Sequence, residues 1–277
     1  MRRHHFGRCG PAIPVVGQGT WQLDAGDRRA AVTALRRGLD LGLTHIDTAE
    51  MYGDAETIVG EAIRGRREEV FLVSKVLPNN GSYDRAMQSC ERSLRRLGVE
   101  RLDCYLLHWR STVPLAETLR AFLELERKGM IAAWGVSNFD VEDLEDLAAL
   151  GHGAGACNQV LYHLEERAIE HAVLPWCEAN GVAVVAYSPF GSGRFPRPDG
   201  VGGRLLAELA TARGVTPRQM ALAFLTRRPS LLAIPKAARV PHVEDNAGAG
   251  DIELTAEELA AIDAAFPAGR PRSLPMI

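Results

Sequence analysis

The chain has 277 residues, of which 46% are hydrophobic and 24% charged, and its formal net charge is −3. This balance is typical of a globular protein with a large core, and it excludes a disordered chain and gives no reason to expect nucleic-acid binding. No apolar run reaches the roughly 18 residues of a membrane span, and no apolar signal segment follows the basic start of the chain, so neither a membrane protein nor a secreted one is expected.

Five cysteines are spread along the chain without any CxxC spacing, and an odd number does not suit a disulfide framework. This usage indicates reduced thiols in a cytoplasmic protein. The eight histidines show no HExxH spacing, and the pair His4-His5 is better explained as part of a flexible terminus, so no metal site is expected. The cysteines are Cys9, Cys90, Cys104, Cys157 and Cys177.

From residue 15 onward, short apolar runs alternate with amphipathic stretches. The apolar runs predict eight strands, at 15–19, 43–46, 70–74, 102–107, 132–135, 156–159, 182–186 and 231–234. Helices are predicted between them, at 28–41, 56–64, 84–97, 115–128, 141–150, 168–180 and 217–226, with left-handed caps at Gly98, Gly129 and Gly181. Residues 191–203, rich in Gly, Pro and Arg, are expected to form a long loop, and a last helix is predicted at 256–266.

Strands that alternate with helices form parallel βα units with right-handed crossovers. A doubly wound open sheet would fit this alternation too. The count of eight, the chain length and the lack of a linker favour a closed (β/α)8 barrel, or TIM barrel, which forms a single α/β domain over residues 1–277. The segment Gly17-Gln18-Gly19-Thr20-Trp21 lacks the third glycine of the GxGxxG motif, so the usual dinucleotide fingerprint is missing.

Three polar residues stand at the ends of successive predicted strands, where a barrel enzyme carries its active site: Asp47, Lys75 and His108. Tyr52 lies five residues beyond Asp47 in the same loop. Each residue alone has a simpler explanation, as a helix N-cap, a loop aromatic or a hydrogen-bonded core histidine. Together the four residues form one constellation with a specific chemistry.

A tyrosine hydroxyl is a weak acid, with an unperturbed pKa of about 10. An ammonium group about 4 Å away stabilises the phenolate by roughly 4 kcal/mol at an effective dielectric constant near 20, or about three pKa units, while burial acts in the opposite direction. We therefore expect Lys75 to tune Tyr52 as a general acid. Asp47 is expected to hold Lys75, and His108 to donate to the substrate oxygen. The chain has 29 arginines but only three lysines, so a lysine at this strand end supports a specific role.

Six motifs resemble those of the aldo-keto reductases and occur in the family's order. They are Asp47-Thr48-Ala49-Glu50-Met51-Tyr52-Gly53, Val73-Ser74-Lys75, Leu106-Leu107-His108-Trp109, Trp134-Gly135-Val136-Ser137-Asn138-Phe139, Asn158-Gln159-Val160 and Ala186-Tyr187-Ser188-Pro189-Phe190. The resemblance runs from about Ile13 to Phe266, and the bacterial methylglyoxal-reductase-like branch is the most similar. It implies a TIM barrel that binds NADPH in an extended form without a Rossmann domain, which accounts for the missing glycine motif.

The resemblance also implies a role for each motif. Tyr52 is implied as the proton donor, tuned by Lys75 and Asp47, and His108 as the residue that orients the carbonyl group. Residues of the later motifs are implied to hold the nicotinamide carboxamide (Ser137, Asn138, Gln159), to stack on its ring (Tyr187) and to follow the pyrophosphate (Phe190 and its neighbours). The cofactor-binding residues expected in all are Gly19, Thr20, Asp47, Ser137, Asn138, Gln159, Tyr187, Ser188, Pro189, Phe190, Ile234, Lys236, Ala237, Arg239, His242, Asp245 and Asn246.

The segment implied to bind the adenosine end departs from the family's pattern. Ala237 stands where Ser or Thr is common, His242 where a second arginine is often found, and Asp245 where Glu is usual. Lys236 and Arg239 still supply two cations, and Arg239 can bind a 2′-phosphate through two parallel hydrogen bonds. NADPH is therefore the expected cofactor, with NADH as an alternative.

The resemblance implies a small-molecule carbonyl substrate, and a monomer is expected. Trp21 and Trp109 are expected to line the mouth of the substrate pocket, together with Met51 and Phe139. The loop at 110–114 is short and few residues follow Phe266, which predicts an open, permissive site for small aldehydes and dicarbonyls. Two other functions fit part of the pattern: a lyase or isomerase that uses the strand-end lysine as a Schiff base, and a cofactor-binding sensor with little turnover.

Overall fold

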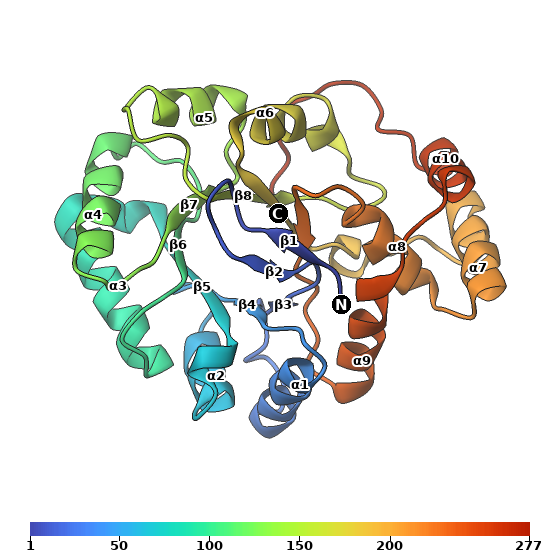
Figure 1. Cartoon of the computed structure of the whole chain (residues 1–277), viewed down its shortest axis with the longest axis horizontal. Helices are drawn as coiled ribbons and strands as arrows, with labels where there is room; N and C mark the ends of the chain where they lie inside the picture. Colours follow the sequence, from blue (N-terminus) through green and yellow to red (C-terminus); the bar gives the residue numbers. More distant parts are fainter.

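The computed structural model describes residues 1–277, and eight parallel strands form its central ring (Figure 1). Each strand pairs with the next along the chain. Parallel bridges from Val16 to Ala233 and from Gly19 to Lys236 join the last strand to the first, so the ring closes and the predicted (β/α)8 barrel is confirmed. The strands are β3 (Gln18–Gly19), β4 (His45–Asp47), β5 (Phe71–Val76), β6 (Cys104–Leu107), β7 (Trp134–Ser137), β8 (Cys157–Leu161), β9 (Ala183–Tyr187) and β10 (Leu231–Ala233).

Helices surround the ring, and most of them lie within a few residues of their predicted positions. Gly98 and Gly181 end two helices in the left-handed conformation, with φ of 66° and 69°, as their positions predict. No helix is long and apolar enough to cross a membrane. The predicted helices are observed as α1 (Arg28–Asp40), α2 (Ala55–Ile63), α3 (Tyr83–Leu97), α4 (Leu115–Arg127), α5 (Val141–Ala148), α6 (Val173–Asn180), α8 (Pro217–Leu225) and α10 (Ala256–Ala265).

Two further helices, α7 (Val201–Arg213) and α9 (Val240–Gly248), were not predicted. The sequence prediction therefore made the loop at 191–203 longer than it is, since α7 begins at Val201. Helix α7 has two glycines in its first turn, and α9 is short and rich in Val, Asp, Asn and Gly, so local propensity is weak in both. Packing overrides propensity here, because α7 lies against α8 and α10, and α9 lies against α1.

A short antiparallel hairpin of β1 (Arg3–His5) and β2 (Ala12–Pro14) precedes the barrel and was not predicted either. In Figure 1 it crosses the middle of the ring. Its Phe6 and Ile13 are buried against the inward-facing side chains of the strands, such as Phe71. The hairpin therefore closes the end of the barrel that lies opposite the carboxyl ends of the strands.

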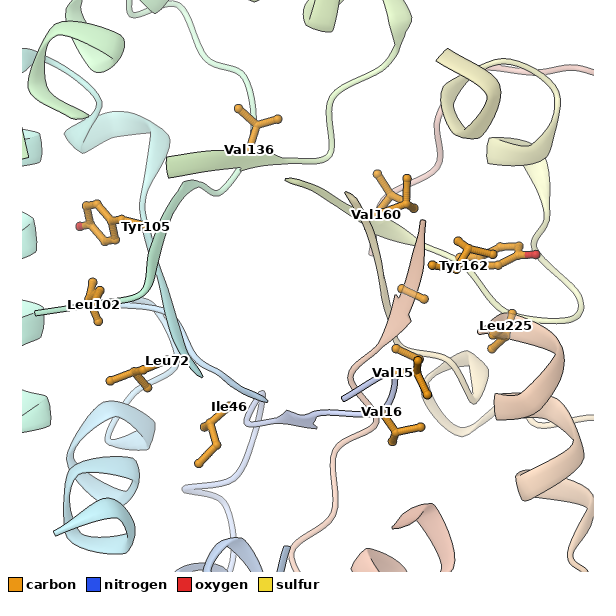
Figure 2. Packing of buried hydrophobic residues seen from close by; sticks show 14 of the residues in the cluster. Val15, Val16, Ile46, Leu72, Leu102, Tyr105, Val136, Val160, Tyr162 and Leu225 are labelled. Atoms are coloured by element: carbon orange, nitrogen blue, oxygen red, sulfur yellow. The ribbon is translucent and has the colours of Figure 1, made fainter. Parts of the chain in front are cut away.

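The barrel strands alternate between two environments, as the pleat of a strand requires. One set of side chains, including Ile46, Leu72 and Tyr105, points out from the ring toward the helices and belongs to the larger core cluster (Figure 2). The other set of side chains points into the ring and forms a smaller hydrophobic cluster, which includes Val73 and Leu106. On each strand, every second residue after an inward apolar one therefore faces the barrel axis too.

Candidate active site

The inward alternation continues past the apolar interior to the carboxyl ends of the strands. On β5, for example, Phe71 and Val73 face inward, so Lys75 does as well. The same parity turns one polar or aromatic side chain from each of several strands toward the axis. The residues are Asp47, Lys75, His108, Ser137, Gln159, Tyr187 and Lys236.

These strand ends surround a cavity of about 330 Å³ at the mouth of the barrel. Most of the site residues predicted from the sequence lie in its wall, although they come from distant parts of the chain. The predicted residues that line the cavity are Gly19, Thr20, Trp21, Asp47, Tyr52, His108, Trp109, Ser137, Asn138, Gln159, Tyr187, Ser188, Ile234 and Lys236.

A buried ion pair lies at the base of the cavity. The Nζ atom of Lys75 donates to Asp47 Oδ1 at 2.5 Å and to the Thr48 carbonyl at 2.8 Å, and both charged side chains are almost fully buried. Gln159 Nε2 donates to the other Asp47 oxygen at 2.8 Å. Burial alone would lower the pKa of Lys75, but Asp47 and Tyr52 raise it above its usual value, so the lysine stays charged.

Tyr52 lies over this lysine and beside His108. Its hydroxyl is 3.5 Å from His108 Nε2, and Lys75 Nζ is 5.0 Å from the centre of its ring. Burial raises the pKa of Tyr52, and the opposing effect of Lys75 is smaller, so the phenol is protonated. Burial, helped by the Lys75 charge, lowers the pKa of His108 to about 2, so its imidazole is neutral. The cavity therefore presents two neutral groups able to donate protons or hydrogen bonds.

The next strand ends form a hydrogen-bonded group around Asn138. Its side-chain Nδ2 donates to the His108 carbonyl at 3.1 Å, and its Oδ1 accepts from the Tyr187 hydroxyl at 2.9 Å. Ser137 Oγ donates to the Gln159 carbonyl at 2.8 Å. Asn138 has a φ of 60°, in the left-handed region that asparagine adopts more often than most residues with a side chain.

The residues predicted for the adenosine end lie beyond the cavity. Arg239 is the exposed N-cap residue of α9, His242 is exposed in its first turn, and Ala237 is half-buried before it. The carboxylate of Asp245 accepts from the Thr216 hydroxyl at 2.8 Å, so it already holds the start of α8.

The remaining predicted residues of this region are less accessible. Asn246 and Pro189 are buried. The ring of Phe190 lies 5.8 Å from that of Phe195 and 5.6 Å from the guanidinium of Arg218.

One wall of the cavity comes from a segment that sequence reasoning missed. Met276 and Ile277 line the cavity, and Figure 1 places the C-terminal end of the chain near the centre of the ring. An ion pair between Arg272 and Glu166 ties the segment to the loop after β8. The short tail after Phe266 therefore contributes to the wall of the site, and no sequence signal predicted where this irregular segment runs.

Phe139 was also misplaced by the sequence prediction. It is fully buried in the outer core and does not line the cavity, whereas Met51 lies in the cavity wall and is 44% exposed. Phe139 follows Asn138, whose left-handed backbone changes the direction of the chain, so the alternation of side chains along β7 does not extend to Phe139.

A closed barrel that gathers a phenol, an imidazole and a buried lysine–carboxylate pair at its strand ends is a barrel enzyme with a general acid at the usual place for an active site. Residues 15–266 match the model described as the Aldo/keto reductase family. The chain therefore belongs to the aldo/keto reductase family.

Individual relatives match over nearly the whole chain. The chain is 46% identical to "Methylglyoxal reductase YeaE" of Escherichia coli, covering 95% of this chain and 94% of that protein. It is 30% identical to "Glyoxal reductase" of Bacillus subtilis, covering 92% and 90%. A crystal structure of an aldo/keto reductase from Klebsiella pneumoniae in complex with NADP and acetate is 44% identical, with a TM-score of 0.93 over the full length of both chains.

Proposed function

We propose that this protein uses NADPH to reduce small aldehydes and dicarbonyls, methylglyoxal among them, to alcohols. The observation that carries the proposal is the contact of Tyr52 with His108 above the buried Lys75–Asp47 pair, at the base of the cavity. The similarity to methylglyoxal and glyoxal reductases supports the substrate class. The similarity to structures that hold NADP or NADPH supports the cofactor.

In the proposed reaction, this chain's own groups manage the proton. Tyr52, kept neutral by burial, protonates the carbonyl oxygen, and neutral His108 donates a hydrogen bond that orients it. Lys75 stabilises the phenolate that remains, and Asp47 keeps the lysine charged and in place. When bound, the nicotinamide supplies the hydride for the carbonyl carbon.

The polar groups around the cavity suit a nicotinamide cofactor. Gln159 Nε2 uses one of its two N–H groups on Asp47, and the side-chain oxygen of Gln159, Oε1, can accept from a carboxamide. Tyr187 offers a ring to stack on, with its hydroxyl fixed by Asn138. Exposed Lys236 and Arg239 give the adenosine end two cations suited to a 2′-phosphate. These residues favour NADPH over NADH, although Ala237 contributes no hydroxyl.

The geometry gives less support to the alternative functions. A lysine that forms a Schiff base must be able to lose its proton and reach the substrate. Lys75 instead stays charged, donates to Asp47 and Thr48, and lies beneath the cavity wall rather than in it. A sensor would need the cofactor-binding residues but has no use for a phenol placed on an ion pair.

The test is a Tyr52→Phe variant in an absorbance assay at the nicotinamide band, with a panel of aldehydes and both NADPH and NADH. We expect the wild type to turn over methylglyoxal with NADPH, and the variant to lose turnover while it still binds NADPH in a fluorescence titration. A variant that keeps its rate would contradict the role of Tyr52. A wild type that binds NADPH but reduces none of the carbonyls would favour the sensor.

We further propose that residues 1–277 form one domain and that the protein is a cytoplasmic monomer. Both the N-terminal hairpin and the C-terminal segment return to the barrel, and all five cysteines are free thiols. Four of the six exposed large apolar side chains line the cavity, which leaves only Leu150 and Val201 elsewhere, too few for an extended interface. Light scattering should give the mass of one chain, and a dimer mass would contradict this.

A further inference from the structure

The loop that carries Tyr52 contains a buried carboxylate for which the proposed reaction has no use. Glu50 lies two residues before Tyr52, and its side chain is only 6% exposed. It does not line the cavity. Its Oε1 accepts from the backbone N–H of Leu77 at 2.7 Å and from Asn80 Nδ2 at 3.0 Å, while Arg92 is 3.8 Å from the other oxygen.

These bonds connect the loop of Tyr52 to the segment that carries Lys75. Leu77 is two residues beyond Lys75, and the backbone N–H of Glu50 also donates to the Lys75 carbonyl at 3.2 Å. Lys75 Nζ in turn donates to the carbonyl of Thr48, two residues before Glu50. The loop is therefore held to the end of β5 by its backbone, by the lysine and by the Glu50 carboxylate.

The far side of the same loop is held by Asp24. Its Oδ2 accepts from the backbone N–H of Asp54 at 3.4 Å. Gly53 has a φ of 53°, and a Cβ atom at this position would collide with the Asp24 carboxylate. Tyr52 thus sits between two fixed points, Glu50 before it and Gly53 after it. Of these two residues, only Glu50 is hydrogen-bonded to the end of β5, the strand that carries Lys75.

We propose that Glu50 is a positioning residue, which sets the separation between the Tyr52 phenol and the Lys75 ammonium. The proposal rests on the proposed function, in which Tyr52 is the acid. The interaction of two charges falls with their distance, and a displacement of about 1 Å in an active site can lower a rate by roughly a hundredfold. Glu50 acts through the geometry of two hydrogen bonds, since the backbone N–H of Leu77 and the Nδ2 of Asn80 both donate to the same carboxylate oxygen, Oε1.

The test compares Glu50→Ala, which removes both bonds, with Glu50→Gln, whose amide oxygen can still accept both. The matched control is Asp103→Ala. Asp103 Oδ2 accepts from the backbone N–H of Leu72 at 2.7 Å on the same strand, β5, but at the end opposite the active site. The three variants and the wild type are compared by kcat, by NADPH dissociation constant, by thermal melting and by the pH dependence of kcat.

We expect Glu50→Ala to lower kcat about tenfold or more while the NADPH dissociation constant changes less than twofold. The alkaline limb of the pH profile of kcat should move to higher pH in this variant, because a more distant Lys75 stabilises the Tyr52 phenolate less. The carboxylate of Asp47 and the neutral imidazole of His108 are expected to stay in place. Glu50→Gln should keep most of the rate and the wild-type limb. Asp103→Ala should melt at a lower temperature without moving the limb.

The proposal is overturned if Glu50→Ala keeps kcat within twofold, or if it loses rate with an unmoved alkaline limb, as a purely structural residue would. It is also overturned if Glu50→Gln is as impaired as the alanine variant, since the charge would then matter and not the geometry. If Glu50→Ala does not fold, Asn80→Ala removes one of the two donors, and an unchanged limb there has the same meaning. Failure of the proposed function is distinct, because it appears as an active Tyr52→Phe.

Discussion

Replacing Lys75 with methionine tests the electrostatic basis of the proposed reaction. The ammonium lies 5.0 Å from the centre of the Tyr52 ring. Taken as the charge separation for a phenolate whose charge is shared between the oxygen and the ring, this distance corresponds to about 3 kcal/mol of stabilisation at an effective dielectric constant near 20. If the transition state carries most of that charge, Lys75→Met should lower kcat by roughly two orders of magnitude, since about 1.4 kcal/mol corresponds to a factor of ten.

The chain offers a matched control, because it has only two other lysines. Lys128 is exposed and lies 3.8 Å from Glu124, so Lys128→Met makes the same chemical change far from the cavity. Both variants are measured by steady-state reduction of methylglyoxal with NADPH, after circular dichroism has shown that each is folded. A folded Lys75→Met enzyme whose kcat stays within tenfold of the wild type would refute the electrostatic role of the lysine.

Three further predictions concern acid stability, cofactor choice and a buried network. Burial lowers the pKa of His45 to about 3, so above pH 6.5 His45 is neutral in both the folded and the unfolded chain and does not affect stability. Below pH 6.5 the unfolded chain takes up a proton at His45 that the folded chain does not, so the free energy of unfolding should fall by about 2 kcal/mol at pH 5. His45→Leu should remove that part of the loss in urea unfolding. Arg239→Ala should raise KM for NADPH roughly tenfold or more and leave KM for NADH unchanged, because a charged hydrogen bond contributes about 1.5–3 kcal/mol. Arg167→Met should lower stability by about 3–5 kcal/mol with little change in kcat at 25 °C, since the buried guanidinium bonds Glu170, Asp263 and the Phe266 carbonyl.

Each of these predictions has a contradicting result. Equal pH dependence of unfolding in wild type and His45→Leu would mean that His45 can be protonated in the folded state. Parallel losses with both cofactors in Arg239→Ala would point to a general defect and not to recognition of a 2′-phosphate. An Arg167→Met variant with an unchanged urea midpoint would show that the network around Glu170 adds no net stability.

The barrel and the group of side chains at its strand ends could be predicted because both depend on local patterns. Period-two alternation marks a strand, and in a parallel sheet it also decides which strand-end residues face the axis. Asp47 after Ile46 and Lys75 after Ser74 are therefore readable from spacing once eight βα units have been counted. The balance at Tyr52 was not readable, because the effect of burial on its pKa exceeds that of Lys75 only in the packed structure.

The sequence by itself determined the barrel, the inward face of each strand and which phenol, lysine and imidazole meet at the strand ends, since periodicity and residue type carry that information. Only the tertiary structure decided what depends on contacts between distant segments. These are the helices α7 and α9, held by packing, the C-terminal wall formed by Met276 and Ile277, and the link from Glu50 to Leu77. The reason is physical: an irregular segment has no period, so its path is decided by the surfaces and donors that it meets.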